Sequence, residues 1–319
     1  RKHAVFDDAF TTDAGLSRNI EVVMGIAEVD EPLFRADQPW EFRMDNGFPS
    51  VIYDISESPS YKLWYHAFFD CKRNPPECHP EYDNTGMLYA ESDDGRKWRK
   101  PSFSFSKIPG SDYGATSNVV WPGGYAFGLL KDPQEVNQSR VYKAFGRLKQ
   151  PIPGKKILDA EAGGVIVSGD GIHWTDPLEL PLRVRWDTHH SILWHGAEGR
   201  YVLVSLGPRS SMVISSSALG SFTGFSSLEV IATPIRADDN IISAQVFAYY
   251  GVYLAFITTS SDTCSLLARY PCHDRLRCQL AWSADLRHWK RFRSEQWQFQ
   301  ETPANFGRLN YSSRGFDEV

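Results

Sequence analysis

Met-Leu-Tyr-Ala-Glu-Ser-Asp-Asp-Gly-Arg-Lys-Trp, residues 87–98, is the stretch that decides the fold. Its first part is rich in apolar and aromatic residues, as in a β-strand, and the Asp-Gly pair then predicts a tight turn. The turn recurs as Ser-Gly-Asp-Gly-Ile-His-Trp at 168–174 and as Ser-Ala-Asp-Leu-Arg-His-Trp at 283–289. A degraded copy, Ser-Ser-Ser-Ala-Leu-Gly-Ser-Phe, lies at 215–222. Copies about 50 to 75 residues apart predict a repeated four-stranded unit, as in the blades of a β-propeller.

The strand-like runs around these turns predict the rest of the architecture. The runs at 48–53, 61–68 and 86–92 form one antiparallel unit with the first turn. The run at 118–121 is predicted to be the innermost strand of the second unit. No stretch keeps a helical period over a dozen residues, and no linker divides the chain. We therefore expect an all-β, five-bladed propeller of four-stranded antiparallel blades in a single domain, residues 1–319. The predicted blades cover about 45–100, 115–176, 187–225 and 240–292, and the N-terminal strands with 293–319 form the fifth.

Composition excludes some classes of partner. The net charge is -5, from 34 basic and 39 acidic residues, so no general attraction to nucleic acid or anionic membranes is expected. No apolar run approaches the ~20 residues that a membrane-spanning helix needs. The oligomeric state is left open.

The five cysteines bear on the compartment. Cys71 and Cys78 bracket one loop, Cys272 and Cys278 bracket another, and Cys264 is left over. Five free thiols in a cytosolic protein are one interpretation. Two short disulfides in a secreted protein are the favoured one, because such pairs form in oxidising compartments. The triplets beginning at Asn137 and Asn310 fit the N-glycosylation pattern and agree with secretion.

Several stretches together resemble a known superfamily. They are the Trp-Glu pair at 40–41 and residues 47–54, 62–65, 89–98, 171–175, 187–190 and 245–253. The pattern covers most of the chain and resembles the five-bladed propeller glycoside hydrolases, closest to poorly characterised secreted proteins similar to the invertase and arabinanase families. The resemblance implies a glycosidase with a poly- or oligosaccharide substrate. The chain lacks the Trp-Met-Asn-Asp-Pro stretch of the invertase type, so a non-catalytic propeller that binds glycans or proteins is the alternative.

The catalytic candidates are acids at the start of predicted inner strands, because residues at one end of these strands converge on the central channel. A glycosidase needs two carboxyl groups that flank the scissile bond, often with a third that tunes the acid. The resemblance implies Asp45 as base or nucleophile. Asp187 is the candidate stabiliser or pKa modulator, and Asp317 or Glu318 is the candidate acid. The plainer interpretations are a turn residue for Asp45, a loop residue for Asp187 and a terminal tail for the last two.

Polar and aromatic residues near these acids are the candidates for substrate binding, through sugar hydroxyls and rings or, for Arg43 and Arg209, through the carboxylate of an acidic sugar. They are Trp40, Arg43, Asn118, His189, His190, Arg209, Asp239 and Gln245. Adjacent strand residues point to opposite faces, so only one of the two histidines is expected to face the channel. The same geometry disfavours a metal site on this pair. No metal ligand set and no cofactor is predicted, although a structural Ca²⁺ in the channel stays open.

Overall fold

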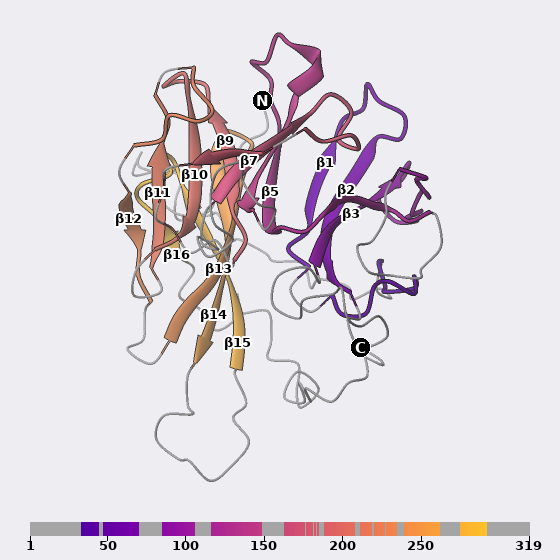
Figure 1. Cartoon of the computed structure of the whole chain (residues 1–319). Helices are drawn as coiled ribbons and strands as arrows, with labels where there is room; N and C mark the ends of the chain where they lie inside the picture. The colour runs from indigo at the N-terminus through magenta and orange to yellow at the C-terminus, as the bar shows by residue number, and fades with distance from the viewer. Residues whose placement is uncertain are drawn as a thin grey trace, which may run out of the picture.

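The computed structural model describes residues 33–44, 47–69, 85–105, 116–148, 163–175, 177–180, 182, 184, 188–207, 211–218, 220–226, 228–234, 239–261 and 275–291. These residues form four antiparallel sheets of four strands each (Figure 1). The first contains β1 (Ser50–Tyr53), β2 (Tyr61–Phe68), β3 (Thr85–Ser92) and β4 (Val119–Pro122). The second contains β5 (Tyr125–Lys131), β6 (Tyr142–Arg147), β7 (Gly163–Ser168) and β8 (Leu178–Leu180), with the short 3-10 helix η3 (Gln138–Arg140) between β5 and β6. The third contains β9 (Ser191–His195), β10 (Arg200–Leu206), β11 (Met212–Ser216) and β12 (Glu229–Ala232). The fourth contains β13 (Asp239–Tyr249), β14 (Val252–Ser261), β15 (Arg275–Ser283) and β16 (Lys290–Arg291).

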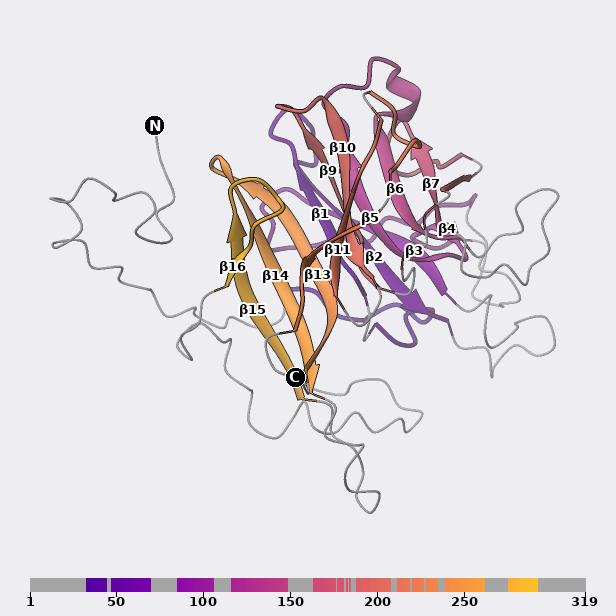
Figure 2. The same cartoon turned by 90° about the vertical axis from the view of Figure 1, so that its left-hand side faces the viewer.

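The four sheets are the blades of a propeller. Their first strands, β1, β5, β9 and β13, contact one another in chain order, while the later strands of each sheet lie progressively farther out (Figure 2). The predicted all-β propeller of four-stranded antiparallel blades is confirmed. The predicted number of blades is not, because the described residues contain four rather than five. The segments predicted for the fifth, the strands within 1–32 and residues 293–319, lie outside the described residues.

One strand was assigned to the wrong blade. Residues 118–121 were predicted as the inner strand of the second blade, but β4 pairs with β3 at the outer edge of the first, with Met87 opposite Trp121. Gly123 and Gly124 both have positive φ, at 78° and 72°, and form the turn into β5, the true inner strand. An apolar run such as Val-Val-Trp suits either edge of a sheet, so its pattern does not reveal its neighbour.

The three Ser-x-Asp copies of the repeated turn share a core of hydrogen bonds. Ser168 Oγ donates to Asp170 Oδ1 at 3.0 Å and accepts from the backbone N–H of Gly171 at 2.9 Å. Asp170 Oδ1 also accepts from the backbone N–H groups of Ile172 and His173 at 2.8 Å. Burial alone would raise the pKa of Asp170, but these bonds and the His173 ring lower it to about 2. The turns that begin at Ser92 and Ser283 repeat the serine-to-aspartate bond at 3.0 Å.

Tryptophans and this turn join neighbouring blades. Trp64 of β2 is fully buried, and its indole Nε1–H donates to the carbonyl of Gly171 in the second blade at 2.7 Å. Trp174, which ends that turn, packs against the same cluster, which includes Met87 and Phe127. The tryptophan that ends this copy of the repeat therefore packs between the first two sheets.

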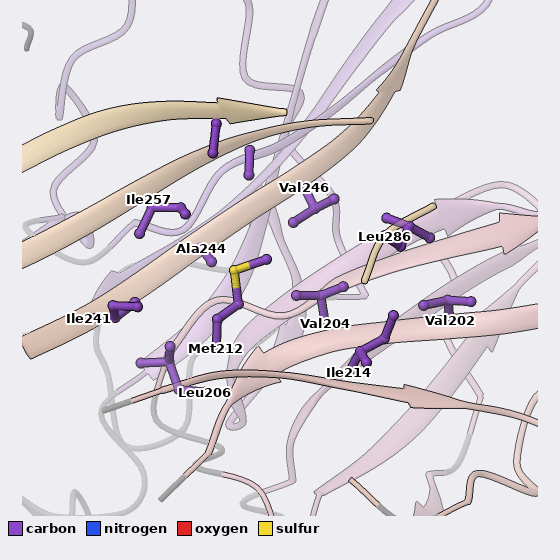
Figure 3. Packing of buried hydrophobic residues seen from close by; sticks show 12 residues of the cluster. Val202, Val204, Leu206, Met212, Ile214, Ile241, Ala244, Val246, Ile257 and Leu286 are labelled. Carbon is purple, nitrogen blue, oxygen red and sulfur yellow. The ribbon is translucent and has the colours of Figure 1, made fainter. Parts of the chain in front are cut away.

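The third and fourth blades meet through an aliphatic core. Figure 3 shows Val204, Met212 and Ile214 from one blade beside Ile241 and Val246 from the other, all 4% exposed or less. The alternation along β10 places every second residue, from Val202 to Leu206, in this cluster. Burial of this surface is the main contribution that fixes the two blades to each other.

A polar contact recurs at successive interfaces. Tyr142 OH, at the start of β6, donates to Glu57 at 3.2 Å and accepts from Lys62 Nζ at 3.0 Å. One blade later, Tyr201 OH donates to Asp132 at 2.5 Å, and Lys143 Nζ donates to the same carboxylate at 2.7 Å. In each case an acid in the first hairpin of a blade, a lysine in its second strand and a tyrosine of the next blade meet. We call this arrangement the hairpin latch.

Candidate functional site

The candidate site is the end of the propeller at which the inner strands begin, the lower end of β13 in Figure 1. Here Gln245 Nε2, on β13, donates to the carbonyl oxygen of Pro49, just before β1, at 3.2 Å. Thr188 Oγ1, just before β9, donates to the carbonyl of Ile242 at 2.6 Å. These two bonds tie the entrances of the first and third blades to the fourth, so the three inner strands converge at one place. We call this region the axial end.

Aromatic rings connect the remaining entrances. The ring of Phe48 lies 5.3 Å from that of Tyr125, at the start of β5, and 6.1 Å from that of His189. Phe48 has φ of 38°, a left-handed conformation that is uncommon for a bulky residue. The carbonyl of the preceding Gly47 accepts a hydrogen bond from His66 N–H at 2.7 Å, which holds this turn against the first blade. The fold thus directs Phe48 toward the third blade.

The two adjacent histidines meet different neighbours. His189 contacts Phe48 and is 5% exposed, and burial lowers its pKa to about 4, so the ring is neutral at pH 7. His190 is fully buried, and its Nδ1 lies 2.8 Å from Ser205 Oγ of β10. A Cβ on Gly128 would lie 1.5 Å from the carbonyl oxygen of His190, so β5 passes this point without room for a side chain. His189 therefore borders the axial end, and His190 supports it from within the third blade.

Several predicted site residues lie outside the described residues. These are all four catalytic candidates, Asp45, Asp187, Asp317 and Glu318, together with Arg209. Asp239 is the first residue of β13, opposite Ser261, and only its backbone is described. Their roles stay predictions.

Trp40 and Asn118 occupy a different place from the one predicted. Asn118 Oδ1 accepts from Trp40 Nε1 at 2.8 Å, and its Nδ2 donates to Tyr65 OH at 2.7 Å and to the carbonyl of Tyr89 at 2.8 Å. Asn118 is 1% exposed, and its amide is occupied within the protein, since it makes three of its four hydrogen bonds there. It holds residues 33–44 against the first blade rather than opening an inner strand. The strand assignment for 118–121 was wrong, and this contact follows from the same pairing of β4 with β3.

The same region contains the buried carboxylate of Glu41 and Arg43, one of the predicted substrate-binding residues. Glu41 accepts from Tyr65 OH and forms an ion pair with Lys100 at 2.8 Å. Burial and the nearby Glu41 raise the pKa of Tyr65. Arg43 lies with its guanidinium 4.0 Å above the centre of the Phe68 ring, an arrangement that stabilises both groups. These residues anchor the chain as it approaches Gly47.

The residues that sequence reasoning missed at the axial end are Phe48, Tyr125 and Thr188. Phe48 and Thr188 do lie in stretches singled out by the resemblance, next to the predicted acids. Tyr125 carried no such signal, because its strand was taken as the second of the blade rather than the first. Gln245 was predicted and does lie at this end.

The described residues bear on the expectations about metal sites, membrane-spanning helices and disulfides. Among them no group of three or more His, Cys, Asp or Glu side chains could hold a metal ion. Their helices include none long and apolar enough to cross a membrane. Cys278 carries a free thiol, so the predicted Cys272–Cys278 disulfide is not formed; β15, which runs beside β14, places Cys278 opposite Thr258. The other four cysteines lie outside the described residues.

Comparison with known proteins gives likenesses of fold. No known family model and no curated protein matches the chain. A GH43 endo-arabinanase from Bacillus licheniformis is similar with a TM-score of 0.43 and 14% identity, over 78% of this chain and 76% of that one. A family 117 glycoside hydrolase from Zobellia galactanivorans is similar with a TM-score of 0.48 and 12% identity, over 81% and 71%. An N-acetylgalactosamine deacetylase from F. plautii, in complex with blood group B trisaccharide, has a TM-score of 0.43 and 12% identity over 67% of this chain and 62% of its own.

Proposed function

We propose that the protein is a glycoside hydrolase that cleaves a poly- or oligosaccharide at the axial end of the propeller. In this proposal Asp45 is the base or nucleophile, Asp187 stabilises the transition state or tunes the acid, and Asp317 or Glu318 is the acid. The observation that carries the proposal is the contact between Phe48 and His189, whose rings lie 6.1 Å apart although they belong to the first and third blades.

Two candidate acids are close to this contact in the sequence. Asp45 precedes Phe48 by three residues, and Asp187 precedes His189 by two. Consecutive Cα atoms are about 3.8 Å apart, so segments of three and two residues span at most about 11 Å and 8 Å. Paired glycosidase carboxyls are about 5 to 9.5 Å apart. Chain connectivity therefore allows both acids to reach one sugar ring.

The described side chains at this end suit a sugar. Phe48 is half-buried and offers ring surface on which a sugar can stack, and the buried ring of Tyr125 packs against it. Gln245 offers an amide, and neutral His189 offers both a donor and an acceptor. A neutral imidazole forms no ion pair with a nearby carboxylate, and its N–H is a hydrogen-bond donor. These groups would orient the ring while the carboxyls perform the proton transfer.

The test is reducing-sugar release from arabinan, xylan, galactan and agarose by the wild-type chain and by Asp45→Asn and Asp187→Asn variants. Asp93→Asn is the matched control, because Asp93 is an exposed acid whose only described partner is Arg99. Loss of at least about a hundredfold in rate is expected for Asp45→Asn, with the control unchanged. Unchanged turnover in Asp45→Asn would remove the assignment. Binding without sugar release by the wild type would favour the non-catalytic propeller.

We also propose that the protein is secreted and that residues 1–32 and 293–319 complete a fifth blade. Asn137 supports the first point, because it lies in an exposed turn, where it caps η3. To test secretion, the protein from its native source is treated with an N-glycosidase, and a loss of mass is expected. Asn137→Gln is the control. Deletion of residues 1–32 tests the second, since removal of blade strands would lower the unfolding midpoint.

A further inference from the structure

A cavity lies at the opposite end of the propeller from the candidate site. Its volume is about 410 Å³, within the range of small-molecule sites. The hairpin after β5 supplies Gln134, Glu135 and Arg140, and the third blade supplies Trp194, Tyr201 and Phe222. Because β5 starts at the axial end and this hairpin follows its last residue, a strand of about 20 Å separates the two places.

Three aromatic rings form one wall of this cavity. The rings of Trp194 and Tyr201 are 4.9 Å apart at 64°, and those of Tyr201 and Phe222 are 6.4 Å apart at 83°. Such edge-to-face contacts fix each ring in place. Trp194 is half-buried, so part of its indole is available to a ligand. Rigid aromatic surface of this kind binds the apolar face of a ligand at low entropic cost.

The charged residues that line the cavity are one ion pair, Glu135 and Arg140, and this pair is the floor. The lysine and aspartate of the hairpin latch between the second and third blades lie fully buried behind it. Lys143 pairs with Asp132 at 2.7 Å and with Glu135 at 3.0 Å, and Arg140 pairs with Glu135 at 2.9 Å. Burial alone would raise the pKa of Glu135, but its bonds to Asn137 N–H, Lys143 and Arg140 lower it. In the lining one cation thus faces one carboxylate, and the buried pair of Lys143 and Asp132 behind them is also neutral, so neither an anionic nor a cationic ligand gains a net attraction.

The rim carries unused hydrogen-bonding groups. The side-chain amide of Gln134 and the hydroxyl of Thr223 both line the cavity, and neither has a hydrogen-bond partner among the described residues. Arg140 is 44% exposed and presents the outer face of its guanidinium. A phosphate-bearing ligand would need an excess of positive charge, and a lipid chain would need a continuous apolar wall. A neutral polyhydroxylated ring fits aromatic walls, free amide and hydroxyl groups and a neutral floor.

We propose that this cavity is a binding site for one or two rings of a neutral oligosaccharide. The site needs no catalytic carboxylate, so it goes beyond the proposed hydrolysis and can be tested in a chain that does not turn over. It would hold a polysaccharide at a distance from the axial end.

The experiment is isothermal titration and saturation-transfer NMR with xylohexaose, α-1,5-arabinohexaose, β-1,4-galactohexaose and, as a charged comparison, tetragalacturonic acid. The Asp45→Asn/Asp187→Asn chain is the background, so that hydrolysis does not consume the probe. Trp194→Ala is expected to weaken binding of the neutral probe about tenfold, and Gln134→Ala about fivefold. Ile55→Ala is the matched control, because Ile55 is 81% exposed in the corresponding hairpin of the first blade. Binding should change less than about twofold between 50 and 500 mM salt, since no net charge is neutralised.

Three outcomes would overturn the proposal. They are failure of all neutral probes to bind, tighter binding of tetragalacturonic acid, and binding that Gln134→Ala and Trp194→Ala leave unchanged, which would place the ligand elsewhere. Gln134 is exposed and its side chain holds nothing in place, so that variant stays informative if Trp194→Ala fails to fold. Because binding is measured directly, failure of the proposed hydrolysis would not affect the result.

Discussion

Replacement of Gly171 by alanine tests how rigidly the repeated turn joins two blades. Gly171 has φ of 79°, and a Cβ at this position would lie 2.5 Å from Cζ2 of Trp64. Trp64 is fully buried and donates its indole hydrogen to the Gly171 carbonyl, so it cannot move without losing that bond. The left-handed conformation costs an alanine about 1 to 2 kcal/mol, and forcing an extra carbon into a packed core costs about 1 to 3 kcal/mol. The free energy of unfolding should therefore fall by about 2 to 5 kcal/mol.

Two other glycines separate these contributions. Gly251 has φ of 89° with nothing within 4 Å of a Cβ, so Gly251→Ala should show the backbone cost alone, about 1 to 2 kcal/mol. Gly95, at φ of 70°, is the intermediate case, with a Cβ 3.2 Å from the Tyr61 ring. Urea unfolding followed by tryptophan fluorescence gives the three values. If Gly171→Ala destabilised the protein no more than Gly251→Ala, Trp64 would have room to shift, and the rigid contact inferred between the first two blades would be wrong.

Three further predictions concern buried polar groups. The pKa of His189 is about 4 in the folded chain, whereas that of an ordinary histidine is 6.5. As the pH falls, the unfolded chain therefore binds the proton first, and the free energy of unfolding should fall by about 3 kcal/mol between pH 6.5 and pH 4. Urea midpoints across this range should lose part of their slope in His189→Gln. Lys143→Met leaves the buried carboxylates of Asp132 and Glu135 without their shared cation, and about 3 to 5 kcal/mol of stability should be lost at pH 7. An unchanged urea midpoint would contradict this. Asn118→Ala should lower the free energy of unfolding by about 2 to 4 kcal/mol, because three hydrogen bonds are lost, while KM for the axial substrate stays the same. A raised KM at unchanged stability would instead support the predicted role of Asn118 in binding sugar.

The blades could be predicted because the information for each turn lies within seven residues. The side chains of Ser168 and Asp170 bond only within the turn, to each other, to its backbone and to the His173 ring, so the same sequence gives the same structure wherever it occurs. The strands before each turn could be predicted for a similar reason, since their apolar residues face a core on both sides. Structure that is set by contacts within a few consecutive residues could therefore be predicted from the sequence.

Contacts between segments far apart in the chain could not be predicted in this way. Trp40 and Asn118 are 78 residues apart, and nothing near either residue indicates that they meet. The error over 118–121 has the same origin, because strand order depends on which edge of β3 is free rather than on the strand itself. Asn118 was consequently read as a residue of the channel when it is an anchor at the edge of a blade.

The ion pairs between blades also narrow the choice of catalytic acid. A general acid needs a pKa raised toward neutrality. Asp54 has its pKa lowered by the Lys131 ammonium, and Glu57, whose pKa burial would raise, has it lowered by Lys131 and Lys62. The same holds for Glu135 in the next hairpin. Asp54 and Glu57 pair with Lys131 of the next blade, while Glu135 pairs within its own blade, and all three lie at the end where the inner strands finish. Under the proposed function none of the three is suited to be the proton donor, which agrees with the choice of acids from the axial end.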